Sequence, residues 1–218
     1  ATRHALGLIS MRAPMGAMLL LAWPLAQAQL CQEWSAPETI GTLDVGLLPE
    51  TSGMEISDDG LVFLINDGTR PSLFVAEPDG SILRQVTVMG FRPLDLEDLA
   101  LGRCGSDTCL YFADIGDNGR RRSTVQIAVV DANAGFDTDA LPVRHVVVAR
   151  YPDGPHDAEG IAIHPVSGDL WLATKQALGR TGPVRLYRLT AEQLAADEEQ
   201  VFELVGEIAV AALAAGNG

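Results

Sequence analysis

The stretch "EGIAIHPVSGDLWLATK", residues 159–175, contains two short runs in which apolar and polar residues alternate, separated by a polar turn with Gly. Such alternation is typical of half-buried β-strands, and Gly, Asp and Pro mark the turns between them. Two other stretches have the same plan: "EISDDGLVFLINDG" from Glu55 and "EDLALGRCGSDTCLYFADIGDN" from Glu97. This internal repeat decides the fold.

Two more strands are expected after each repeat, at residues 73–76 and 82–88, 125–130 and 143–151, and 184–189 and 202–210. A β-sandwich also contains short strands, but four strands in each repeat of roughly 40–60 residues favour propeller blades. We therefore predict an all-β fold, a β-propeller of four-stranded antiparallel blades. The blades are residues 51–90, 91–151 and 152–210, about half of a six-bladed ring.

The remaining segments are interpreted around these blades. Residues 1–28 contain a short apolar run that ends in Ala26-Gln27-Ala28, which predicts a secretory signal peptide cleaved after Ala28; the alternative is an N-terminal membrane anchor. We expect a periplasmic or secreted protein with no membrane span in the mature chain. Residues 29–50 form an entry segment with an outer strand of the closing blade at 39–45, and residues 211–218 begin the next blade.

Charge and cysteine content restrict the partners. The formal charge of −14 repels phosphate backbones, so nucleic acid is not an expected partner; a small polar ligand or another exported protein is. Cys104 and Cys109 flank a turn-forming sequence and would form a disulfide in an oxidising compartment, or else stay free thiols. Cys31 would be a reactive thiol, pair outside this chain, or carry a lipid anchor.

Acidic residues begin the three repeats. The first strand of a propeller blade lines the central channel, so Glu55, Glu97 and Glu159 are expected to converge there. Converging carboxylates repel one another unless their pKa values rise, water separates them, or a divalent cation binds. Oxygen ligands favour calcium, with magnesium second. The predicted metal ligands are Glu55, Glu97, Asp98, Asp114, Asp117 and Glu159; the alternative is a structural network of carboxylates in the channel.

Other polar residues lie nearby in the pattern. Asp95 and Asp157 flank the expected channel. Three residues follow the second strands of their repeats and would lie at the mouth of the channel: Asn66, Asp67 and Asn118. The alternative for these three is a turn without further function. Lys175 occupies the matching place in the third repeat and would neutralise an anionic substrate. His156 would act as a base or contact the substrate.

Three motifs carry a resemblance to a known family: "PLDLEDLALG", "LYFADIGDN" and "YPDGPHDAEGIAIHPVSGDLWLATK". They resemble exported bacterial propellers of the six-bladed TolB-like fold, many of which have no assigned activity. The chain is more remotely similar to gluconolactonase-type and phytase-type propellers. That similarity implies calcium and acidic residues near the axis.

Three functions follow as hypotheses. The first is an exported binding module with an acidic, calcium-binding axial site. The alternative is a calcium-dependent hydrolase of a small phosphate ester, lactone or other ester, in which the metal would polarise the substrate or activate a water molecule. The third is a structural protein anchored to a surface through Cys31.

Overall fold

Strands dominate the structure, a computed structural model that describes residues 36–176 and 182–209. In the unit that begins at Thr39, the helical elements are α1 (Ala191–Leu194) and the short 3-10 helix η1 (Ala132–Ala134). The expectation of an all-β fold is confirmed. The predicted signal peptide, Cys31 and residues 211–218 lie outside the described residues. Within that described part, no helix has both the length and the apolar character needed to cross a membrane.

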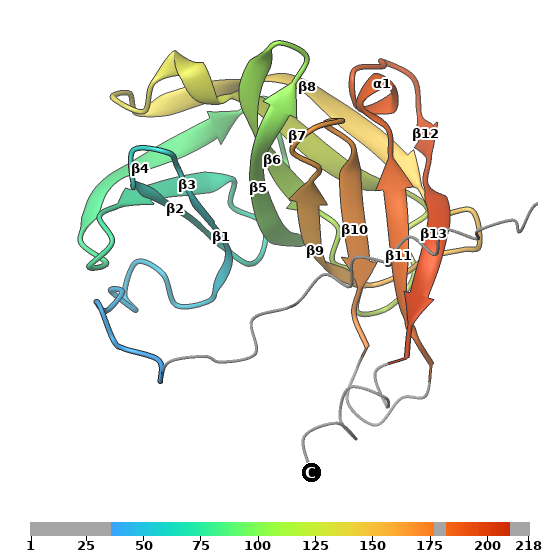
Figure 1. The fold of residues 1–218 in the computed structure, drawn as a ribbon, viewed down its shortest axis with the longest axis horizontal. Coiled ribbons are helices and arrows are strands. Elements are labelled where there is room, and N and C mark those ends of the chain that lie inside the picture. Colours follow the sequence, from blue (N-terminus) through green and yellow to red (C-terminus); the bar gives the residue numbers. More distant parts are fainter. Residues whose placement is uncertain (1–35, 177–181, 210–218) are drawn as a thin grey trace, which may run out of the picture. The chain divides into compact units, whose positions relative to one another are not determined.

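The strands form three antiparallel four-stranded meanders (Figure 1). The first contains β1 (Thr51–Ile56), β2 (Val62–Asn66), β3 (Ser72–Ala76) and β4 (Ile82–Met89). The second contains β5 (Leu96–Cys104), β6 (Asp107–Asp114), β7 (Val125–Asp131) and β8 (Ala140–Arg150). The third contains β9 (Ala158–Ile163), β10 (Leu170–Thr174), β11 (Val184–Leu189) and β13 (Glu203–Ile208), with α1 and β12 (Gln200–Val201) between the last two strands.

The first two meanders are linked at their outer strands. The end of β4 pairs in parallel with the start of β8, which gives the order β1-β2-β3-β4-β8-β7-β6-β5. The two end strands of this order, β1 and β5, lie beside each other, so the sheet nearly closes. The third meander is a separate sheet, although β12 pairs with β8.

Two hydrophobic cores fill the spaces between the meanders. One contains Phe63, Leu73 and Val86 from the first meander together with Leu99 and Phe112 from the second. The other combines residues of β5–β8 with residues of β9–β11. Alternate residues of β2, β3, β6 and β7 therefore face a neighbouring sheet, as the alternation in the sequence predicts.

The first strands of the three meanders are neighbours: β5 lies between β1 and β9 (Figure 1). A β-carbon on Gly53 would lie 2.5 Å from the backbone nitrogen of Leu99, so only glycine allows this approach of β1 to β5. On the other side, the Ile161 amide of β9 donates to the Asp98 carboxylate of β5 at 2.7 Å. This arrangement brings the polar ends of the three first strands together.

The turn within the second meander carries a disulfide. Cys104 ends β5, Cys109 lies on β6, and the structure joins them across the β5–β6 turn with a Cα–Cα distance of 5.7 Å. The expected hairpin disulfide is therefore present in the structure.

Two segments differ from the sequence-based expectation. Residues 39–45, expected as an outer strand, are not a strand here, because none of the described strands pairs with this segment. The Thr42 amide donates to the Asp79 carbonyl at 3.1 Å, and a turn begins at Asp44. The pattern of residues 191–199 predicts a short helical segment between the last two strands; the helix α1 is shorter and ends at Leu194.

One face of the first meander keeps apolar side chains exposed. Met54 and Ile56 on β1 are both 59% exposed, and with Leu43 they line an apolar groove of about 390 Å³.

Candidate cation site

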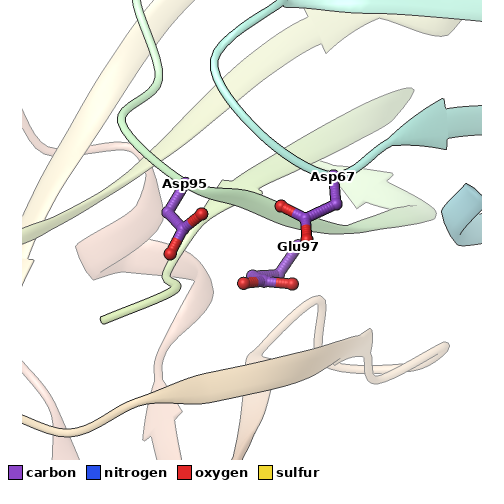
Figure 2. Close-up of side chains that lie close together, drawn as sticks. All are labelled: Asp67, Asp95 and Glu97. Carbon is purple, nitrogen blue, oxygen red and sulfur yellow. The ribbon is translucent and has the colours of Figure 1, made fainter. Parts of the chain in front are cut away.

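Three carboxylates converge where β2 ends and β5 begins. Asp67 follows β2, Asp95 precedes β5, and Glu97 is the second residue of β5. One carboxylate oxygen from each lies within 4.8 Å of the other two, and Figure 2 shows the three side chains around a common space. Glu97 is only 4% exposed, Asp95 is half-buried and Asp67 is exposed, so the cluster opens to solvent on the side of Asp67.

The backbone fixes this convergence through Leu96. Gly68 and Leu96 form an isolated antiparallel bridge: the Gly68 amide donates to the Leu96 carbonyl at 3.2 Å, and the Leu96 amide donates to the Gly68 carbonyl at 2.9 Å. Because Leu96 stands between Asp95 and Glu97, the bridge places Asp67 against both. This contact joins two meanders, and neither segment alone predicts it.

Glu97 owes its position to a β-bulge. In the β5–β6 ladder, Leu96 is opposite Asp114 and Asp98 is opposite Ala113, so Glu97 is an extra residue without a partner. A bulge redirects the side chain of the extra residue, and bulges are common next to functional sites. Here the bulge turns the carboxylate of Glu97 toward Asp67 and Asp95 (Figure 2).

Gly116 leaves the space that the carboxylates occupy. A β-carbon at this position would lie 2.3 Å from Glu97 Oε1 and 2.5 Å from Asp95 Oδ2, far inside van der Waals contact. The Gly116 amide also donates to the Asp95 carbonyl at 3.1 Å. The glycine of the Asp114–Asn118 segment is therefore part of the wall of the cluster.

Asp114, a predicted metal ligand, lies behind the cluster and orders the loop that carries Asp95. Its fully buried carboxylate accepts the amides of Leu94 and Asp95 at 3.0 and 2.8 Å. Arg122 donates to both of its oxygens, at 2.9 and 2.6 Å. Since these four donors occupy both oxygens, the contacts support a positioning role for Asp114.

The cluster is electrostatically unfavourable when every carboxylate is ionised. Burial raises the pKa of Glu97 to about 8, with the charges of Glu159, Asp67 and Asp95 adding to the rise and Lys175 opposing it. Burial also raises the pKa of Asp95, and Asp67 contributes to that rise. A bound cation would remove this penalty, because an opposite charge favours the ionised form.

The strand register corrects the alignment of the three glutamates. Glu159 occupies a bulge in β9 that matches the bulge of Glu97, because Ala158 is opposite Thr174 and Gly160 is opposite Ala173. In β1 the corresponding irregularity lies between Thr51 and Met54, so Ser52, not Glu55, stands closest to the equivalent place. The Ser52 hydroxyl donates to the Glu97 carbonyl.

The register also reveals acids that begin each repeat. In each meander, an acidic residue before the first strand accepts a backbone amide from just after the second strand. The Asp67 amide donates to the Glu50 carbonyl, the Gly116 amide to the Asp95 carbonyl, and the Lys175 amide to the Asp157 carbonyl. The sequence analysis does not single out Glu50, which lies at the end of the expected entry segment, residues 29–50.

Glu55 and Asp98 are not among the three carboxylates of this cluster, but the charge of Glu55 acts on Asp98. Burial raises the pKa of Asp98, and the charge of Glu55 adds to the rise, while the hydrogen bond from Ile161 lowers it. Asp98 therefore links β5 to β9, and Glu55 contributes charge to that link.

Asp117 and Asp157 are buried and organise the loop after β6. The Asp117 amide donates to Asp157 Oδ1 at 2.8 Å, and the Arg122 amide donates to Asp117 Oδ2 at 2.7 Å. Asn118 is exposed in the turn that follows. The side chain of Asn66 accepts the Glu50 amide at 3.3 Å and so orders the segment that leads into β1. Asp114 accepts the Asp95 amide in the same way before β5.

His156 and Lys175 both have acidic partners. Lys175 donates to Glu159 at 2.5 Å, which raises the pKa of the lysine. His156 Nε2 lies 3.1 Å from Asp153 and 3.2 Å from Arg185 Nη1.

The chain matches no protein-family model, and a search of curated proteins finds no match. Function is therefore inferred from the geometry of the site.

Proposed function

We propose that this protein is an exported propeller-type binding module whose Asp67, Asp95 and Glu97 bind a divalent cation, calcium first and magnesium second. The observation that supports this proposal most strongly is the group of three carboxylate oxygens within 4.8 Å of one another around a buried glutamate. Carboxylate oxygens are the hard ligands that both ions prefer.

The three oxygens lie close enough together to contact one ion of either kind. Oxygens on opposite sides of a Ca²⁺ ion are about 4.6–5.2 Å apart, whereas those on opposite sides of Mg²⁺ are about 4.0–4.2 Å apart. A set that spans up to 4.8 Å is compatible with direct ligation of one Ca²⁺ ion. Mg²⁺ gives up its water ligands reluctantly and usually keeps several of them, so calcium is placed first.

The repeated sheets support the propeller. Each meander has four antiparallel strands, its first strand lies next to the first strand of its neighbour, and a hydrophobic core separates consecutive sheets. Propeller blades pack in this way around an axis. The exposed Met54 and Ile56 on the first meander present an apolar face, which supports packing of a further sheet against it, as a larger ring would require.

Binding is supported better than hydrolysis. Of the two predicted catalytic residues, His156 has its Nε2 next to Asp153 and Arg185, and Lys175 is paired with Glu159. These contacts engage Nε2 of His156 and one N–H group of Lys175. The three converging carboxylates therefore support cation binding more directly than these two side chains support acid–base catalysis.

Calorimetric titration of metal-free protein with CaCl₂ tests the proposal. We expect one site per chain with a Kd of about 10⁻⁵–10⁻³ M, the range of moderate and weak protein calcium sites. Glu97→Gln should weaken binding at least tenfold, whereas Glu77→Gln, which removes an exposed glutamate in the β3–β4 turn, should not. Equal affinities for the two variants would exclude the proposed ligand set.

A further inference from the structure

A small polar cavity of about 140 Å³ lies beside Lys175, with Arg120, Arg185 and His156 also in its wall. The whole chain carries a formal charge of −14, yet the described residues that line this cavity include three cations and a histidine but no Asp or Glu. Positively charged side chains gathered around a cavity attract anions.

Arg120 has an unusual backbone at this place. Its φ of 50° is the only positive φ of a non-glycine residue in the part of the chain that the structure describes. The turn is closed by the Arg120 amide, which donates to the Asp117 carbonyl at 2.8 Å. A non-glycine residue in this region costs of order 1 kcal/mol or more and is typical of functional sites. Within the described residues, no carboxylate forms an ion pair with Arg120, so its charge is available to a ligand.

The other two cations retain hydrogen-bond donors. Lys175 uses one of its three N–H groups on Glu159. Arg185 uses Nε on Glu207 at 3.2 Å and Nη1 on Asp153 at 2.7 Å and on His156, which are three of its five N–H groups. The acids therefore hold these side chains in place without closing the cavity.

His156 is positioned by aromatic packing. Its ring contacts Tyr151 edge-on, with centroids 5.1 Å apart, and Tyr187 at 5.5 Å. The aromatic contacts hold His156 on one side of the cavity, whose lining also includes Arg120.

We infer that this cavity binds a phosphate-type oxyanion. Guanidinium groups match the oxygens of phosphate with several charge-assisted hydrogen bonds, and a lysine adds a point charge. A volume of about 140 Å³ is below the usual range for drug-sized ligands, about 300–1,000 Å³, so one anionic group is a better fit than a large ligand. The inference deepens the proposed binding function, because it names the charged part of the ligand. Anion binding itself does not depend on the cation site.

Calorimetric titration with inorganic phosphate tests this inference. The protein is freed of metal with chelator, and the chelator is removed by dialysis because it is itself an anion. We expect millimolar or tighter binding to wild type, and Arg120→Ala should weaken it at least tenfold. The matched control is Arg121→Ala, which removes the same charge from the same turn at a residue outside the cavity lining. It should change affinity less than twofold.

Two results would overturn the inference. One is no phosphate binding to wild type at millimolar concentrations; the other is the same affinity for both arginine variants, which would indicate only general charge attraction. Acetate binding as tight as phosphate would refute the phosphate-type assignment. Thermal melting of both variants checks that they fold.

Calcium titrations of the same proteins separate this inference from the proposed cation site. Glu97→Gln should lose calcium affinity and keep phosphate affinity, and Arg120→Ala should do the reverse. Failure of either site therefore appears in its own measurement.

Discussion

Glu97→Gln, which keeps the size of the side chain and removes its charge, is expected to stabilise the metal-free protein at alkaline pH. Burial is the main cause that raises the pKa of Glu97 from its ordinary value of 4.5 to about 8. Between these values the folded protein keeps a proton that the unfolded chain releases. The contribution of Glu97 is therefore complete below pH 4.5 and is lost as the pH rises through 8.

The size of this effect follows from the same shift. One proton of difference between the folded and unfolded states lowers the free energy of unfolding by at most about 1.4 kcal/mol per pH unit, or about 2.7 kcal/mol between pH 6 and pH 8. Because the cluster opens to solvent at Asp67, screening reduces this value, and we expect about 1–2 kcal/mol. The amide that replaces the carboxylate cannot ionise, so the variant should not suffer this loss.

Urea unfolding at pH 6 and pH 8 in the presence of chelator measures the difference. Wild type should lose about 1–2 kcal/mol more than Glu97→Gln over this interval, and Glu77→Gln should behave like wild type. The reasoning would be refuted if wild type and Glu97→Gln showed the same dependence on pH.

Three further predictions concern the surroundings of the cluster. Gly116→Ala should cost about 1–3 kcal/mol in urea unfolding and weaken calcium binding in calorimetry, since its β-carbon would overlap two carboxylates; unchanged affinity would contradict the proposed wall. Arg122→Met should cost about 3–5 kcal/mol, because it leaves the charge of Asp114 buried without its partner; a loss below about 1 kcal/mol in the same assay would argue against this role. Replacing Cys104 and Cys109 together by Ser should lower stability by about 2 kcal/mol for so short a loop, measured by thermal melting; an unchanged melting temperature would contradict it.

Local patterns predict most of the strands and turns, although residues 39–45 do not form the expected strand. The alternation in 159–175 predicts β9 and β10. The sequence Glu77-Pro78-Asp79-Gly80 is typical of a β-turn, and this turn joins β3 to β4, with the Gly80 amide donating to the Glu77 carbonyl at 2.9 Å. Such signals depend on neighbouring residues, so they can be recognised without knowledge of the fold.

The register of the strands could not be predicted in the same way. An alignment on glutamate matches Glu55 to Glu97, whereas the ladder places Ser52 near that position. A bulge adds one residue to one strand, and only the pairing with the neighbouring strand reveals where it lies.

The cluster itself depends on contacts between meanders. The sequence predicts Glu97 and Asp95 near a channel, but for Asp67 it favours a turn. The approach of Asp67 to the other two results from the bridge between Gly68 and Leu96, residues far apart in the sequence. The sequence likewise does not show that Asp114 is fully buried and paired with Arg122. These contacts give Asp114, a predicted metal ligand, the role of ordering the loop that carries Asp95.

A crystal structure of the protein grown with calcium, or with terbium as an anomalous substitute, tests the central claim most directly. We predict one ion among Asp67, Asp95 and Glu97, with carboxylate oxygens at about 2.3–2.6 Å from calcium. Density for the ion elsewhere, or none between these three side chains in crystals of protein that binds calcium in solution, would contradict the proposed site.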